Sequence, residues 1–204
     1  MNGGVAWFLV ALGLATVIVR RRSAAIVLVT TQSIVLGVAA FALAGGRDAE
    51  FKVASAALVL KGVVLGAVLG WTMLRTREPL PVAEGIPAAV RLIMAVVLAL
   101  GAAALVPSFG IAATDGDATV ALVAIGAAIV LLRRSTLLQA LGLIVAENGV
   151  AIAATSAHRG LPIVIELGFV FDVIVVVAVA VAVHERIHDE FGSGDTGLLR
   201  GLRD

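Results

Sequence analysis

The chain has 204 residues, of which 61% are hydrophobic and 14% charged, with a formal net charge of +1. A water-soluble core of this size cannot hide so large an apolar fraction, which leaves the lipid bilayer as the solvent. The absence of cysteine excludes disulfides and thiolate-ligated zinc or iron–sulfur clusters, and the arginines form no continuous basic stripe that would bind nucleic acid.

Apolar runs separated by charged or Gly/Pro-containing breaks occupy most of the chain. A hydrocarbon layer of ~30 Å requires roughly 20 residues of helix per crossing. We therefore predict an all-α polytopic membrane protein with seven transmembrane helices. The predicted helices span 4–19, 23–43, 51–74, 86–106, 117–132, 135–157 and 162–183, and a charged tail spans 184–204.

The first three predicted helices set the direction of the chain. No cation precedes the first helix, and three arginines at 20–22 follow it directly, which is the reverse of a secretory signal peptide. The first helix is therefore expected to be retained, with its N-terminus outside. The second ends before a polar loop, and the third carries Lys61 near its middle.

The remaining helices follow a proline-rich connector at 79–87, which is typical of an extended loop. Arg91 lies near the start of the fourth helix. An acidic loop at 107–117 precedes the fifth helix, and Arg133 and Arg134 separate the fifth from the sixth.

The distribution of cations indicates the orientation, because cytoplasmic loops retain Lys and Arg during insertion. With the N-terminus outside and seven crossings, only Arg47, Lys52 and Arg159 lie on the outer side, and Lys61 lies within the membrane. The other cations are all cytoplasmic: Arg20, Arg21, Arg22, Arg75, Arg77, Arg91, Arg133, Arg134, Arg186, Arg200 and Arg203.

A weak internal repeat accompanies this pattern. Arg22-Ser23 and its helix match Arg134-Ser135 and its helix at an offset of 112 residues, and Lys61 matches Asp172 at an offset of 111. Helices one to three would then duplicate helices five to seven in the same orientation. Chance similarity between apolar helices is the alternative.

Intramembrane charges are the candidate functional residues, because a charge at the bilayer centre costs roughly 2.5–3.5 kcal/mol even on the insertion scale. Glu147 lies about 18 Å into the sixth helix from its cytoplasmic start, and Asp172 and Lys61 lie about 15 Å into their helices from the outside. These three side chains can meet near the midplane. Glu166 lies only four residues into the seventh helix, closer to the outer surface.

Two interpretations of these charges remain open. In the first, the acids are proton or ion carriers, since burial disfavours a carboxylate and a nearby ammonium favours it. Lys61 is then the charge that tunes them. In the second, the charges form a buried ion pair that fixes helix register without any transport.

Other intramembrane residues have a structural and a functional interpretation. Gln32, Gln139 and Asn148 could bridge water in a proton path, or hydrogen-bond neighbouring helices, which contributes ~1 kcal/mol. Arg91 is a supporting polar residue that can extend to the cytoplasmic boundary. Three glycines at G-x-x-x-G spacing predict a close-packing face on the third helix: Gly62, Gly66 and Gly70.

Two segments near the end of the chain resemble a known family. They are Gln139 through Glu147-Asn148-Gly149, and Pro162-Ile163-Val164-Ile165-Glu166-Leu167-Gly168 with Asp172 four residues on. These segments resemble component E of hydrogenase-4, a membrane subunit that is similar to subunit K of NADH-quinone oxidoreductase. The chain departs from subunit K in that its first three-helix unit has Val35 where the second has Glu147.

The resemblance implies a multi-pass subunit of a membrane-bound group 4 hydrogenase, or of a formate-hydrogenlyase-like complex, in a prokaryotic plasma membrane. The resemblance matches Glu147, and Glu166 or Asp172, to intramembrane acids of the family. We expect Glu147 and Asp172 to carry protons at the midplane and Glu166 to act as a relay member nearer the outer side. The chain itself would hold no cofactor, and the nickel-iron and iron–sulfur centres would belong to partner subunits. Its partners would be the lipid bilayer and other membrane subunits of a complex-I-like assembly. A purely structural anchor subunit and an independent secondary transporter are the alternatives.

Overall fold

Apart from short connections, the described part of the chain is helical in the computed structural model. The structure describes residues 3–43, 49–76, 86–105 and 113–156, together with 177–178 and 181–182. Its six helices are α1 (Gly3–Ile18), α2 (Arg22–Leu43), α3 (Ala49–Thr76), α4 (Ala88–Leu105), α5 (Ala113–Leu132) and α6 (Thr136–Ser156). The prediction of an all-α fold is confirmed. The predicted seventh helix and tail lie outside the described residues, apart from those four positions.

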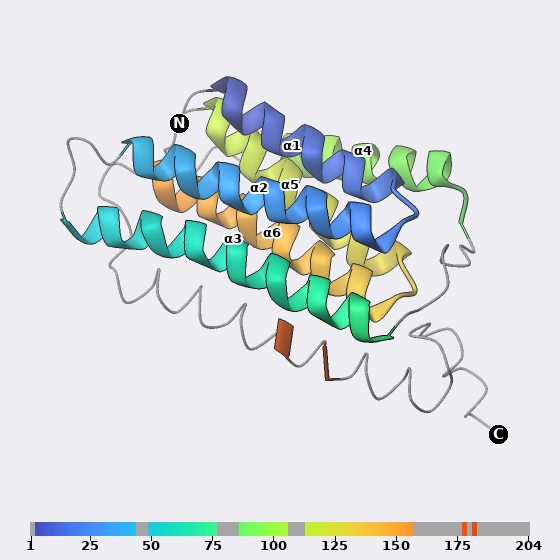
Figure 1. The fold of residues 1–204 in the computed structure, drawn as a ribbon. Helices are drawn as coiled ribbons and strands as arrows, with labels where there is room; N and C mark the ends of the chain where they lie inside the picture. The colour runs from blue at the N-terminus through green and yellow to red at the C-terminus, as the bar shows by residue number, and fades with distance from the viewer. Residues whose placement is uncertain are drawn as a thin grey trace.

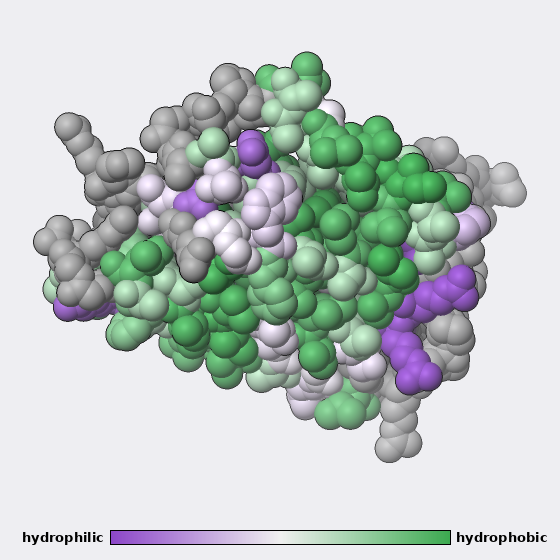
Figure 2. All heavy atoms as spheres, turned by 90° about the horizontal axis from the view of Figure 1, so that it is seen from above, coloured by the Kyte–Doolittle hydropathy of each residue, from purple (hydrophilic) through white to green (hydrophobic). Residues whose placement is uncertain are grey.

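Five of these helices, α2 to α6, are long and apolar enough to cross a membrane. The remaining helix, α1, has 16 residues, which corresponds to a length of about 24 Å at the helical rise. Apolar side chains cover much of the described surface, among them Trp7, Phe41, Leu60 and Leu98. Figure 2 shows one such face, with hydrophobic residues over its middle and strongly hydrophilic ones toward its ends. This surface is that of a protein solvated by lipid.

The helix ends coincide with the breaks in the apolar pattern. The backbone carbonyl of Pro87 accepts the first helical hydrogen bond of α4, from Arg91 N at 3.1 Å, and Ser135 does the same for α6. Proline is tolerated there because its missing N–H is not needed at the start of a helix. The α1–α2 and α5–α6 connections are short and contain the arginines at 20–21 and 133–134.

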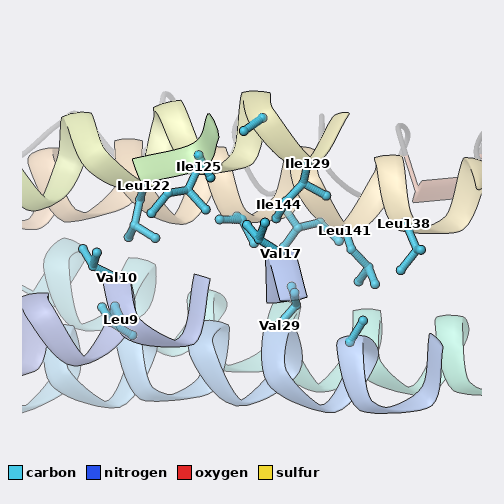
Figure 3. Close-up of a cluster of buried hydrophobic side chains, with 14 of the residues drawn as sticks. Leu9, Val10, Val17, Val29, Leu122, Ile125, Ile129, Leu138, Leu141 and Ile144 are labelled. Atoms are coloured by element: carbon cyan, nitrogen blue, oxygen red, sulfur yellow. The ribbon is translucent and has the colours of Figure 1, made fainter. Parts of the chain in front are cut away.

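Four helices form the centre of the bundle, with α1 packed on α5 and α2 packed on α6. The remaining two flank them, α3 beside α2 and α4 beside α5 and α1 (Figure 1). Aliphatic side chains fill the space between the two central layers. Leu9 and Val29 face Ile125 and Ile144 across it (Figure 3).

The two ends of the bundle differ in charge. We call the end that holds Gly3, Asp115 and Ser156 the Asp115 end, and the end that holds Ile18 and Leu132 the Arg133 end. Among the described residues, the exposed arginines Arg20, Arg21 and Arg134 lie at the Arg133 end. Lys52 is exposed near the start of α3, at the Asp115 end.

One helix begins earlier than its predicted range. The fifth helix was expected from residue 117, after an acidic loop, but α5 begins at Ala113 and holds Asp115 in its first turn. Two effects explain the extension. A carboxylate in the first turn is favourable toward the positive end of the helix dipole, and the first turn of α5 packs against α1, where Thr114 lies beside Gly3.

Candidate intramembrane polar site

A buried ion pair joins α3 to α6 in the middle of the bundle. Lys61 Nζ donates a hydrogen bond to Glu147 Oε1 and forms a salt bridge with it. Both residues are buried, with 2% of Lys61 and 9% of Glu147 exposed. Lys61 lies 12 residues into α3, and Glu147 lies 11 residues into α6. Because these helices run in opposite directions, both side chains come from near the middle of their helices.

An amide and hydroxyl network lies directly beside this pair. Asn148, the residue after Glu147, donates from Nδ2 to Gln32 Oε1 at 2.9 Å and to Ser33 Oγ at 3.0 Å. Gln32 Nε2 in turn donates to the carbonyl oxygen of Leu9 at 2.8 Å. The network therefore links α6 to α2 and α2 to α1. All three of its side chains are buried, as expected for polar groups that must be satisfied inside the bilayer.

Glycines allow the helices to approach closely at this level. A Cβ on Gly62, next to Lys61, would lie 3.1 Å from Ser33 Cβ, and one on Gly66 would lie 2.7 Å from Thr30 Oγ1. These two glycines of the predicted packing face lie against α2. Gly70 does not, because a Cβ there would meet no described atom within 4 Å. It lines a groove of about 520 Å³ between α2 and α3, open on one side.

Two predicted supporting residues lie elsewhere. Gln139 Nε2 donates to the backbone carbonyl of Arg133 at 2.9 Å, so this amide stabilises the α5–α6 connection and takes no part in the central network. Arg91 was expected to extend to the cytoplasmic boundary, but only 1% of it is exposed. Arg91 shares the buried face of α4 with Ala95 and Ala99, and α4 packs against α5 and α1.

Two of the predicted relay residues lie outside the described part of the chain. They are Asp172 and Glu166, so the structure describes Glu147 and Lys61 alone among the predicted relay residues. Within the described residues, no group of three or more His, Cys, Asp or Glu side chains could hold a metal ion.

The sequence pattern alone does not single out Ser33, Asp115 or Ser156. Ser33 belongs to the central network, and its place beside Gln32 was the signal that could have found it. Asp115 is fully buried and accepts a hydrogen bond from Ser156 Oγ at 2.6 Å. The sequence places Asp115 in the acidic loop before the fifth helix, whereas the structure places it in the first turn of α5.

Comparison with known proteins adds one partial similarity. The chain is 33% identical over 95 residues to "Uncharacterized protein Rv0085" of Mycobacterium tuberculosis, which covers 47% of this chain and 43% of that protein. The chain thus matches less than half the length of this curated relative. No family model matches the chain, and no solved structure matches it. These comparisons assign no activity to the chain.

Proposed function

We propose that this chain is an integral membrane subunit of a group 4 hydrogenase or a formate-hydrogenlyase-like respiratory complex, and that Lys61 and Glu147 lie on its proton path. The resemblance of the last two predicted helices to hydrogenase-4 component E supports the kind of complex. The buried pair between α3 and α6 is the observation that carries the role of the two residues.

The chemistry of the pair suits proton transfer. Inside a low-dielectric medium, the ionised pair and the neutral pair differ only by the position of one proton between Lys61 Nζ and Glu147 Oε1. A proton that arrives at Glu147 neutralises the carboxylate and weakens its hold on Lys61, and departure of the proton restores the pair. The side chains of Asn148, Ser33 and Gln32 offer hydroxyl and amide groups beside this step. Redox centres would belong to partner subunits, because the chain has no cysteine to ligate a cluster.

The proposal includes a seven-helix topology in a prokaryotic plasma membrane, with the Arg133 end in the cytoplasm and the N-terminus outside. The arginines at the Arg133 end support this orientation under the positive-inside rule. The packing of α1 on α5 and of α2 on α6 supports the duplication, because corresponding helices of two parallel copies would face each other across an axis along the membrane normal.

A structural role is the second candidate, and the same pair favours it, since a buried ion pair can fix helix register without moving protons. An experiment on the assembled complex in sealed vesicles separates the two roles. Proton translocation and electron transfer are measured for Glu147→Gln and for the double variant K61M/E147M, which removes both charges together. Lys52→Met, an exposed cation nine residues earlier on α3, is the control.

The relay role predicts that both Glu147 variants lose proton translocation by about a hundredfold, the scale of a positioned proton-transfer group, while assembled complex is retained in the double variant. The structural role predicts that the double variant translocates protons normally once it has assembled. Isolation of the chain in mild detergent without hydrogenase-like subunits would instead favour an independent transporter.

A further inference from the structure

A second buried carboxyl group lies at the Asp115 end of the bundle. Asp115 is 0% exposed, although it belongs to the first turn of α5. Its Oδ2 accepts a hydrogen bond from Ser156 Oγ, in the last turn of α6, at 2.6 Å. Burying a carboxyl group is costly unless it is paired, hydrogen-bonded or protonated. Asp115 takes no part in the Lys61–Glu147 pair, so it is a separate buried carboxyl group.

A buried hydroxyl group lies one helical turn deeper on the same face of α5. Thr119 is 7% exposed, and its Oγ1 has no hydrogen-bond partner among the described residues. A threonine hydroxyl can both donate and accept, and leaving one unsatisfied in the interior costs about 1–3 kcal/mol. Thr119 is therefore suited to hold a water molecule or to pass a proton along α5.

The backbone of α6 beside Thr119 leads to the central site. A Cβ on Gly149 would lie 2.9 Å from the carbonyl oxygen of Thr119, so no side chain separates the two helices there. The two residues before Gly149 are Asn148 and Glu147. Ser156 and Glu147 are nine residues apart on α6, which is about 14 Å along the helix axis. Asp115 and Thr119 are four residues apart on α5, which is about 6 Å along its axis.

We infer that Asp115, hydrogen-bonded to Ser156, is the terminal proton-exchanging group of the path at the Asp115 end, and that Thr119 connects it to Asn148 and Glu147. This inference rests on the proposed function. The step transfers only a proton: an Asp115 oxygen takes it up from water and releases it toward Thr119, or the reverse, and no electrons move. Asp115 would thus exchange protons near the outer surface, where the sequence also places Glu166.

Proton translocation by the assembled complex in sealed vesicles tests this role. Asp115→Asn should lower it by about a hundredfold, and Asp115→Glu should restore a large part of it, since the carboxyl group is retained. Asp117→Asn is the matched control, because Asp117 is an exposed carboxylate two residues away on α5. The complex with this variant should translocate protons at the wild-type rate. Translocation at the wild-type rate by assembled Asp115→Asn would overturn the inference.

Thiol labelling provides a readout that does not depend on transport. The chain has no cysteine, so Thr119→Cys is a unique label site in this subunit. A membrane-impermeant thiol reagent added from the Asp115 end should modify it, because the reactive thiolate forms only where water reaches. Val123→Cys, one turn on and exposed on the apolar surface, should stay unmodified. An unmodified Thr119→Cys overturns the inference.

The two proposals fail separately. If Glu147→Gln abolishes translocation and Asp115→Asn does not, the central site stands and the terminal group is wrong. If Glu147→Gln translocates protons at the wild-type rate, the proposed function fails, and the role of Asp115 fails with it, even where Thr119→Cys is modified.

Discussion

Arg133 shows how a single buried cation is accommodated in this bundle. Its guanidinium donates to the carbonyl oxygens of Val17 at 2.9 Å and Thr16 at 3.3 Å, and also to that of Val19. The last carbonyls of a helix have no partners within the helix and carry its negative partial charge. The side chain that directly follows α5 therefore caps the end of α1, which links two helices that are far apart in the sequence.

Replacing this cap should destabilise the protein measurably. Arg133→Ala leaves the α1 carbonyls without their donor, and hydrogen bonds that involve a charged group contribute about 1.5–3 kcal/mol. We expect a lower midpoint of thermal unfolding in detergent. Arg134→Ala, at the neighbouring exposed position, is the control and should change the free energy of unfolding by no more than about 0.5 kcal/mol. Equal effects of the two variants would contradict the capping role.

At the scale of the helix pair, α5 and α6 are in backbone contact. A Cβ on Gly126 would lie 2.5 Å from both Ala146 N and Gly142 O, and one on Gly142 would lie 2.9 Å from Gly126 O. In a bilayer no hydrophobic force holds helices together, so such close van der Waals packing stabilises the pair. The same contact brings Gly149 to Thr119, and so holds Asn148 and Glu147 at their depth beside α5.

Alanine substitutions should distinguish glycines in helix–helix contact, such as Gly126, from glycines beside open space, such as Gly70. Gly126→Ala forces the helices apart against backbone atoms, at a cost of about 1–3 kcal/mol, and should lower both the unfolding midpoint and the yield of folded protein. Gly70→Ala meets no described atom within 4 Å. It should be neutral, or stabilising by about 0.5–1 kcal/mol, since alanine is the better helix former. A harmless Gly126→Ala would mean that α5 and α6 are not packed this closely.

At the scale of the whole molecule, the surface around the middle of the bundle is mostly apolar, and its two ends differ in charge. The helices alternate in direction, so the chain places Arg21 and Arg134 at one end and Thr114 and Asp117 at the other, all of them exposed. A membrane protein with this distribution is expected to insert with its arginines in the cytoplasm.

Cysteine labelling checks this orientation in intact cells. Thr114→Cys should react with an impermeant maleimide added outside, and Arg21→Cys should react only after the membrane has been permeabilised. Both are exposed positions in a chain without native cysteine. The reversed pattern would place the Arg133 end outside, and the terminal group at Asp115 would then exchange protons with the cytoplasm.

Much of the architecture follows from one-dimensional information. Each described helix begins and ends within four residues of its predicted range, because long apolar runs and the cations that interrupt them leave a chain in lipid little choice. Depth along a helix is likewise a matter of counting residues. That is why Lys61 and Glu147 could be expected at one level before their contact was seen.

Direction around the helix axis is different, because it depends on which helices become neighbours. The sequence could not show that Asn148 faces Gln32 and Ser33 while Gln139, on the same helix, turns to the carbonyl of Arg133. It also could not show that Arg91 is enclosed by protein, or that Asp115 belongs to a helix and lies against Ser156. Hydropathy shows which segments cross the membrane, and counting residues along them gives the depth of each side chain. The partners of a side chain are decided by the packing of helices that are distant in the chain.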